Sequence, residues 1–343
     1  GFKDVEGTQI VVFYPDGGVS PVQEKQMLTT NGKNTFVAAV KGNFDECQSA
    51  VKDIFGSTEL RDKLNENSMK FSSANSINWG RLLPQIVYYF WSYLQAIKQD
   101  SIVAGENINL VVPTGNFGNI LAAYYAKKMG LPVANLICAS NKNNILSDFF
   151  EKGEYDTNRN FYLTMSPSMD ILISSNFERF LYEASGRDAE KINSWYADLS
   201  LKGSFTVDPD VLKVCNDNIK AGWADEESVM RVIKSFYLEK NYLLDPHTAV
   251  GMKVYEDYRN STGDNTYTVL ASTASPFKFA DSVLKAIRGG NNIGSWESIG
   301  KLNEITGWKI PSALQDLFSK PIMDVHRCKP ENISEYLINK FIK

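Results

Sequence analysis

Residues 108–139 read INLVVPTGNFGNILAAYYAKKMGLPVANLICA, and this stretch decides the fold. The apolar, β-branched run Ile108–Pro113 predicts a buried strand, and Ile120–Met129 has the spacing of an amphipathic helix. A second apolar run, Val133–Ala139, predicts the next strand. Because strands that alternate with helices indicate a parallel sheet covered on both faces, the sequence predicts an α/β fold.

The loop Thr114–Asn119 joins the first of these strands to the helix. In an open parallel sheet such a loop binds ligands, because its amides and the helix N-terminus converge on an anion. Gly115 and Gly118 allow close approach of the backbone, so a phosphate fits this loop. The alternative is a tight turn in which glycine serves only geometry. The loop matches neither GxGxxG nor GxxxxGKS/T, which disfavours a nucleotide.

The alternation of strands and helices extends along the chain. Further strands are expected at Gln9–Pro15, Thr35–Lys41 and Thr266–Ala271, and helices after Ser20-Pro21, over Trp79–Gln99, through most of Asp188–Arg259 and over Phe277–Ile287. The polar stretch Ser57–Ser73 is left without an element. Two lobes follow from this pattern. Residues 1–102 are expected to form the remainder of a small lobe with a long connecting helix, and residues 103–343 a large ligand-binding lobe with a helical C-terminal extension that caps it.

The composition carries no sign of a nucleic-acid or membrane partner. The 36 basic and 40 acidic residues are mixed along the chain and give a net charge of -4. This distribution argues against the clustered basic surface of a nucleic-acid-binding protein. The apolar runs stop well short of the roughly 20 residues that a membrane span needs. The four cysteines form no CxxC pair, which argues against a zinc site or a disulfide framework and favours a reducing cytoplasm. With only two histidines, the chemistry is expected to borrow an organic cofactor and no metal.

Six sequence blocks together resemble the threonine synthase family. In chain order they are GGVSPVQEKQM at Gly17–Met27, KGNFDECQSAVK at Lys41–Lys52, SANSINWGRLLPQ at Ser73–Gln85, GNFGNILAAYYAKKMGLPV at Gly115–Val133, DPHTAVG at Asp245–Gly251 and STASPFKF at Ser272–Phe279. The resemblance implies a fold-type II pyridoxal-phosphate enzyme, with two lobes of parallel-type sheets flanked by helices and pyridoxal 5'-phosphate as cofactor. The large lobe is then the cofactor-binding lobe.

The resemblance also implies roles for particular residues. The backbone of Gly115, Asn116, Phe117, Gly118 and Asn119 would hold the cofactor phosphate, the hydroxyl of Thr273 would face the pyridine nitrogen, and the substrate phosphate would be bound by Asn75, Ser76, Asn78 and Arg81. Two alternatives stay open: a helix cap for Thr273 and a surface position for Arg81. His247 follows Asp245-Pro246, where a capping or buried hydrogen-bonded histidine is typical, and it is left out of the chemistry.

Phe2-Lys3-Asp4 looks like the FKD triplet that surrounds the Schiff-base lysine in this family. The triplet here lies only a few residues before the strand Gln9–Pro15, whereas in the family it lies well upstream of that strand. The catalytic lysine is therefore expected upstream of Gly1, and no catalytic residue is assigned in this chain. Because that lysine would serve as both nucleophile and base, the chain as given is expected to be inactive.

The reaction implied by the resemblance is that of a pyridoxal-phosphate-dependent carbon–oxygen lyase of threonine biosynthesis. It converts O-phospho-L-homoserine and water to L-threonine and phosphate, in the cytoplasm. A homodimer is one assembly that the resemblance leaves open. A first rival is another β-family lyase, such as a threonine dehydratase or a sulfhydrylase. A second is a non-catalytic ligand-binding protein on the same scaffold, which fold alone never excludes.

Overall fold

The computed structural model describes residues 2–42, 44–73, 78–290 and 293–342, and the chain divides into two compact units. The first comprises Gly1–Ser73, Phe277–Leu284 and Asn291–Lys343, and the second Ala74–Pro276 and Lys285–Gly290. This division differs from the expected boundary near residue 102. The long helix belongs to the second unit, and the C-terminal tail belongs to the first.

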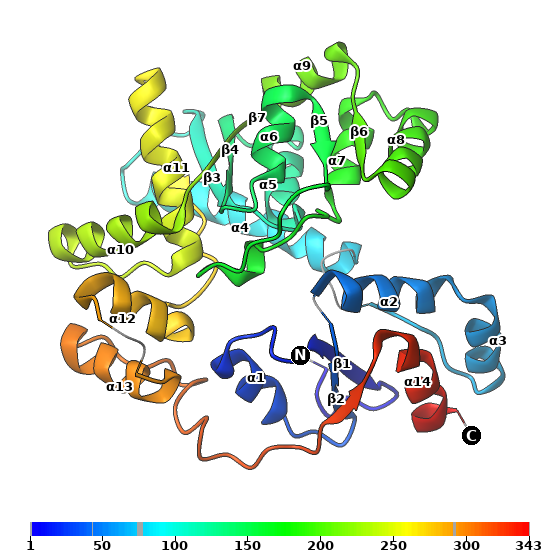
Figure 1. Ribbon diagram of the computed structural model, residues 1–343. Helices are drawn as coiled ribbons and strands as arrows, with labels where there is room; N and C mark the ends of the chain where they lie inside the picture. The colour runs from blue at the N-terminus through cyan, green and yellow to red at the C-terminus, as the bar shows by residue number, and fades with distance from the viewer. Residues whose placement is uncertain (1, 43, 74–77, 291–292, 343) are drawn as a thin grey trace. The chain divides into compact units, whose positions relative to one another are not determined.

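The first unit is built on a parallel three-stranded sheet of order β1-β2-β9 (Figure 1). Its strands are β1 (Ile10–Pro15), β2 (Thr35–Val40) and β9 (His326–Cys328), and its helical segments are α1 (Pro21–Leu28), α2 (Phe44–Gly56), α3 (Thr58–Glu66), α13 (Ser295–Thr306), η3 (Pro330–Asn332) and α14 (Ile333–Phe341). The C-terminal tail belongs to this unit, whereas the sequence led us to expect it as part of the large lobe. Cys328 pairs with Val40, and Ile333 packs into the same apolar cluster, so the tail completes this sheet.

The second unit contains a parallel four-stranded sheet of order β7-β4-β3-β8. Its strands are β3 (Ile108–Pro113), β4 (Val133–Ser140), β7 (Ile219–Trp223) and β8 (Thr268–Leu270), and an antiparallel pair is formed by β5 (Glu154–Asp156) and β6 (Ser204–Thr206). Its helical segments are α4 (Trp79–Lys98), α5 (Gly118–Lys128), α6 (Ile145–Lys152), η1 (Pro167–Met169), α7 (Phe177–Ala184), α8 (Ala189–Lys202), α9 (Pro209–Asn218), α10 (Glu226–Lys240) and α11 (Pro246–Thr262). The residues of two segments, η2 (Pro276–Phe279) and α12 (Ala280–Arg288), are divided between the units.

Helices cover the sheet of the second unit on both faces. Every residue of β3 is buried, which requires cover on either side of a pleated strand. Figure 1 places α11 to one side of β3 and β4, and α5 and α6 to the other. On the α11 side the approach is close, because a Cβ added to Gly251 would lie 2.7 Å from Cδ1 of Leu270. The predicted α/β fold with parallel sheets flanked by helices is confirmed.

The elements that the sequence missed are short or polar. The stretch left without an element contains α3, whose N-terminus is capped by the side chain of Ser57. The region expected to be mostly helical contains the strand β7, which pairs along its length with β4. Helix α5 begins at Gly118 rather than at Ile120, because the backbone of Phe117 starts the helix. This early start brings the helix N-terminus into the loop.

Candidate functional site

The predicted ligand loop lies at the carboxyl edge of the second sheet, between β3 and α5. The helix α5 has no side-chain cap from the described residues. Its first intrahelical hydrogen bond runs from the N–H of Leu121 to the carbonyl oxygen of Phe117, 3.0 Å away. The N–H groups of Gly118, Asn119 and Ile120 precede that bond and have no partner within the helix. Such an N-terminus attracts an anion through its unpaired amides and its helix dipole.

A segment distant in sequence fixes which way the loop faces. We call residues 166–176 the floor segment. Ser174 Oγ donates to the carbonyl oxygen of Gly115 over 2.7 Å, and the backbone N–H and Nδ2 of Asn176 donate to that of Asn116 over 3.1 and 3.0 Å. In a trans peptide the N–H points opposite to the C=O. The amides of Asn116 and Phe117 therefore point away from the floor segment.

The loop rests on the floor segment with backbone against backbone. A Cβ added to Gly115 would lie 2.6 Å from the carbonyl oxygen of Ser168 and 3.2 Å from Cα of Met169. Both are backbone atoms that cannot rotate away, as the end of a flexible side chain could. Glycine is thus required at position 115 because the two backbones approach each other closely. This requirement agrees with both interpretations of the loop, as a tight turn and as a ligand-binding loop.

Phe117 adopts a left-handed backbone conformation, with φ at 61° and ψ at 1°. This conformation is uncommon for a non-glycine residue and is costly for a bulky side chain. The buried ring compensates: its centroid lies 5.0 Å from that of Phe177 and 5.4 Å from that of Phe180. Strain that tertiary packing maintains at a loop is typical of binding sites.

Asn119 is held through its side chain by α4. The buried hydroxyl of Tyr89 donates to Oδ1 of Asn119 and also lies 3.3 Å from its carbonyl oxygen. Burial raises the pKa of Tyr89, so the phenol stays protonated and remains a donor. The amide oxygen of Asn119 is thereby engaged by the protein, and the backbone N–H of this residue remains a donor at the start of the helix.

The expected position of Thr273 is next to this loop. Strand β8 pairs with β3, and the N–H of Ala271 donates to the carbonyl oxygen of Val111 over 2.9 Å, so the carboxyl ends of the two strands are neighbours. Thr273 follows β8 and is exposed. Within the described ranges its hydroxyl makes no hydrogen bond, so the alternative interpretation as a helix cap finds no support.

The four residues expected to bind the substrate phosphate lie at or before the start of α4. Asn75 and Ser76 fall outside the described residues. Asn78 is the N-cap of α4, and its side chain accepts a hydrogen bond from the N–H of Gly80 over 2.8 Å. Arg81 is exposed in the first turn of the helix, in the second unit together with the ligand loop. Asn78 thus has a structural task that the sequence pattern did not indicate.

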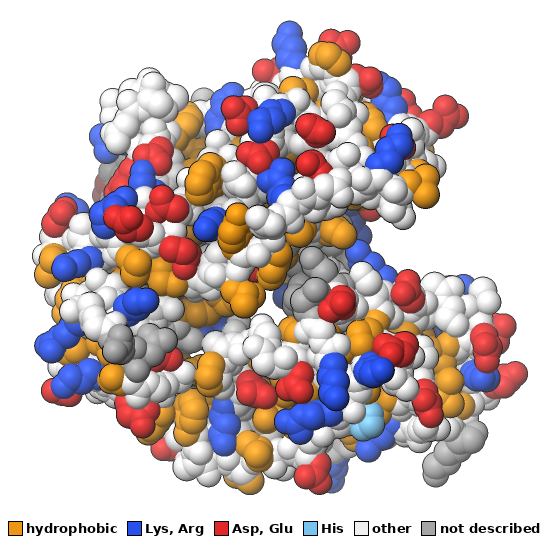
Figure 2. Space-filling view, in the orientation of Figure 1, with side chains coloured by type: hydrophobic (Ala, Val, Ile, Leu, Met, Phe, Trp, Pro, Cys, Tyr) orange, Lys and Arg blue, Asp and Glu red, His pale blue; other side chains and the backbone are white. Residues whose placement is uncertain are grey.

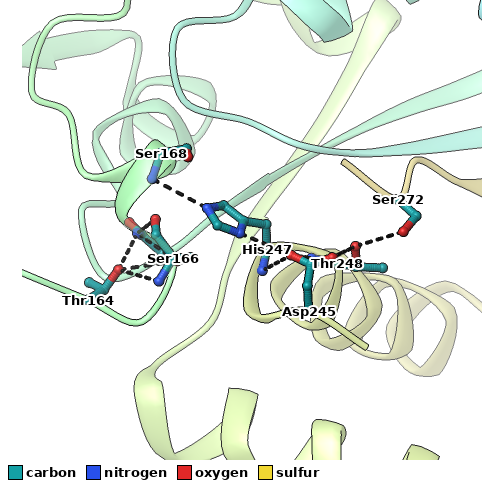
Figure 3. A network of polar contacts seen from close by, with 8 residues as sticks. Thr164, Ser166, Ser168, Asp245, His247, Thr248 and Ser272 are labelled. Carbon is teal, nitrogen blue, oxygen red and sulfur yellow. Dashed lines mark hydrogen bonds and ion pairs between the residues drawn. The ribbon is translucent and has the colours of Figure 1, made fainter. Parts of the chain in front are cut away.

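A polar network at the start of α11 contacts the floor segment through Ser168 (Figure 3). Asp245 caps α11, accepting hydrogen bonds from the N–H of His247 over 2.9 Å and of Thr248 over 3.4 Å. Nδ1 of His247 lies 3.0 Å from Asp245 Oδ1, and its Nε2 accepts a hydrogen bond from the N–H of Ser168 over 3.3 Å. The interpretation of His247 as a buried, hydrogen-bonded histidine at a helix start is confirmed.

A second polar network holds the floor segment itself through Asp170, a buried residue of that segment. The carboxylate of Asp170 accepts hydrogen bonds from Nδ2 of Asn141 over 2.7 Å and of Asn143 over 3.0 Å. It also accepts hydrogen bonds from Oγ1 and the backbone N–H of Thr164 over 2.7 and 2.8 Å. Burial raises the pKa of Asp170, and the four donors partly offset that effect.

Replacing Asp170 with asparagine is expected to lower the free energy of unfolding by about 2 kcal/mol, because an amide NH₂ would face the N–H of Thr164 and leave a buried donor unpaired. Urea denaturation measures this difference. The control is Asp208→Asn, at an exposed side chain paired with Lys191, where a loss under about 1 kcal/mol is expected. Equal losses at the two positions would contradict a structural role for the Asp170 network.

Lys3 lies in the first unit, whereas the ligand loop belongs to the second. Its ammonium is 4.0 Å from Oδ2 of Asp4. The turn around it is held by Asn34, whose Oδ1 accepts a hydrogen bond from the N–H of Asp4 over 2.7 Å, and whose Nδ2 donates to carbonyl oxygens of the same turn. The FKD triplet therefore forms a local turn in the smaller sheet's unit.

Three further properties of the part of the chain that the structure describes concern metal ligands, membrane-spanning helices and cysteines. No group of three or more His, Cys, Asp or Glu side chains there could hold a metal ion, and no helix there is long and apolar enough to cross a membrane. The four cysteines are free and buried, and burial raises the pKa of Cys47 to about 11. On the face shown in Figure 2, basic and acidic side chains are interspersed.

Comparison with known proteins gives one consistent family. The family model for the C-terminal part of threonine synthase matches residues 248–336. The chain is 40% identical over 307 residues to the threonine synthase of Saccharomyces cerevisiae, covering 85% of this chain and 58% of that protein. It is 39% identical over 288 residues to human threonine synthase-like 1, covering 83% of this chain and 38% of that protein.

A solved structure matches along the whole chain. The crystal structure of the PLP-bound threonine synthase from Brucella melitensis superposes with a TM-score of 0.80 at 36% identity, covering 100% of this chain and 67% of that one. The chain spans 58% of the length of the yeast relative and 38% of the human one.

Proposed function

The chain belongs to the threonine synthase family, and from this membership we propose that it carries the pyridoxal-phosphate-binding part of a threonine synthase. Its fold is that of the fold-type II pyridoxal-phosphate enzymes. The proposed reaction is the conversion of O-phospho-L-homoserine and water to L-threonine and inorganic phosphate. The substrate and this reaction are those of the family.

The observation that carries the proposal is the orientation of the ligand loop. Its carbonyls at Gly115 and Asn116 are tied to the floor segment, and the uncapped N-terminus of α5 follows directly. Backbone amides from Asn116 to Asn119 are thus available to hold a phosphate. The donor set consists of neutral N–H groups at a helix N-terminus, which suits the phosphate of pyridoxal phosphate.

We assign the ring of the cofactor to the side of the loop on which Thr273 lies. When bound, the cofactor supplies an electron sink for breaking C–H bonds beside the substrate's amino group. The hydroxyl of Thr273 would face the ring nitrogen as a neutral partner. A hydroxyl stabilises a protonated ring nitrogen less than a carboxylate would, so the cofactor withdraws electrons less strongly. The choice among possible reactions then depends more on how the protein orients the substrate.

We assign the phosphate of the substrate to Arg81. A guanidinium can hold a phosphate with two parallel hydrogen bonds, and Arg81 is exposed two helical turns before Tyr89, the residue that fixes Asn119. Asn78 supports this position by capping α4, since its side chain is engaged with Gly80. These residues bind and orient, while the proton transfers need a base that we do not assign to this chain.

The cofactor proposal is tested by titrating the chain with pyridoxal phosphate and following the cofactor's absorbance. We expect saturable binding that inorganic phosphate competes away, because both ligands would occupy the same loop. Borohydride reduction followed by peptide mapping is expected to leave Lys3 unmodified, because its triplet lies only a few residues before the strand Gln9–Pro15 and not well upstream of it, where the family has the Schiff-base lysine. Stoichiometric labelling of Lys3 would overturn our assignment and make it the Schiff-base lysine.

The reaction is tested in a chimera of the yeast enzyme in which the region matched over 307 residues is replaced by the corresponding part of this chain. We expect release of phosphate and formation of threonine from O-phospho-L-homoserine. A chimera that binds the cofactor but instead deaminates threonine would favour a dehydratase-like lyase. Cofactor binding without turnover of either substrate would favour a non-catalytic binding protein.

A further inference from the structure

The buried pair Asp245 and His247 does more than begin a helix. Both side chains are almost fully buried, with 1% of Asp245 and 3% of His247 exposed. Capping of α11 requires only the carboxylate of Asp245, which accepts the N–H of His247 and of Thr248. The imidazole adds a contact outside the helix, because its Nε2 accepts the N–H of Ser168 from the floor segment over 3.3 Å (Figure 3).

The network fixes the tautomer of this imidazole. Nε2 can accept a hydrogen bond from a backbone N–H only if it carries no proton. The ring proton then lies on Nδ1, where it is donated to Oδ1 of Asp245 over 3.0 Å. Asp245 thus orients the ring so that an acceptor, and not a donor, faces Ser168.

Ser168 connects this pair to the ligand loop. Its carbonyl oxygen is the atom that a Cβ on Gly115 would approach to 2.6 Å, so any displacement of Ser168 moves the surface on which Gly115 rests. The same helix start also reaches the other half of the proposed site. Oγ1 of Thr248 donates to Oδ2 of Asp245 and lies 3.3 Å from Oγ of Ser272, the neighbour of Thr273.

We propose that His247 is a positioning residue for the cofactor phosphate. By accepting the N–H of Ser168, it fixes the position of the floor segment against Gly115, and this position keeps the loop Gly115–Asn119 in the conformation that binds a phosphate. This inference rests on the proposed function. His247 does not touch the ligand, because its buried ring acts through Ser168 and Gly115.

The test compares three substitutions of His247 in the full chain. His247→Gln can place Oε1 near the position of Nε2 and keep the acceptor for Ser168, whereas His247→Asn is too short to reach Ser168 but can still donate to Asp245. His247→Leu loses both contacts. We expect the affinity for pyridoxal phosphate to fall roughly tenfold in the Asn and Leu variants, and to stay within about threefold of the original in the Gln variant.

Hydrogen exchange of the Ser168 amide gives a second readout that needs no ligand. Exchange is expected to speed up in the Asn and Leu variants and to stay slow in the Gln variant. The control is Val254→Ala, a buried substitution on the same helix that contacts Gly222 and should lower stability without changing exchange at Ser168.

The outcomes separate this inference from the proposed function. If the unaltered chain binds no pyridoxal phosphate, the proposed function and this inference both fail. If it binds the cofactor and the Asn variant matches the Gln variant in affinity and exchange, His247 only supports the helix start, and this inference alone is wrong. Loss of affinity in Val254→Ala equal to that in His247→Leu would also overturn it, because the effect would then follow stability.

Discussion

Replacing Gly115 with alanine is expected to weaken binding of pyridoxal phosphate by about two orders of magnitude, because a displaced loop loses hydrogen bonds to a charged phosphate that are worth about 1.5–3 kcal/mol each. The new Cβ would lie 2.6 Å from the carbonyl oxygen of Ser168, a distance that real Cβ atoms do not show. Either the loop or the floor segment has to move. The amide of Asn116 moves with the loop, since it belongs to the same peptide as the carbonyl that Ser174 holds. Titration of the variant with pyridoxal phosphate measures the loss.

Gly300 offers a matched control for this substitution. It lies inside α13 in the first unit, and a Cβ added there meets nothing within 4 Å. Gly300→Ala is therefore expected to leave cofactor affinity unchanged and to raise stability by about 0.5–1 kcal/mol through helix propensity. If Gly115→Ala bound the cofactor as tightly as Gly300→Ala does, the phosphate would have to be held elsewhere than at this loop.

The part of the site that the sequence predicts is the part that is continuous in sequence. The strand Ile108–Pro113 is confirmed at both ends, because a run of β-branched residues ending at proline leaves little choice of structure. The loop follows from its glycines and its place between a strand and a helix. Its left-handed residue could not be predicted, since phenylalanine is disfavoured in that conformation and only the aromatic cluster around it compensates.

The floor segment could not be predicted for a different reason. Ser168, Ser174 and Asn176 carry no periodicity, and Ser174 and Asn176 act on carbonyl groups about 60 residues away in the chain. Such pairings depend on tertiary structure, so no local pattern reports them. One signal was present, because the run SPSMDILISSN at 166–176 places several serines and an asparagine in an otherwise apolar region. Buried polar residues need partners, and here the partners are the loop and the helix start at His247.

Replacing Phe117 with alanine is expected to lower the free energy of unfolding by about 3–5 kcal/mol, the usual cost of removing a fully buried phenylalanine. The ring is 1% exposed and lies against Phe177 and Phe180, so little rearrangement can fill the space. Urea denaturation measures the change. Phe161→Ala, at a phenylalanine that is 39% exposed in the same unit, is the matched control and should lose much less.

Substituting glycine at the same position separates packing from backbone strain. At an ordinary helical position glycine is less stable than alanine by about 1 kcal/mol. At Phe117 the order should reverse, because φ is 61° and an alanine Cβ in that conformation costs about 1–2 kcal/mol that glycine avoids. Phe117→Gly is therefore expected to be the more stable of the two variants. If alanine proved more stable, the left-handed start of α5 would be wrong, and with it the early helix N-terminus on which the proposed phosphate site depends.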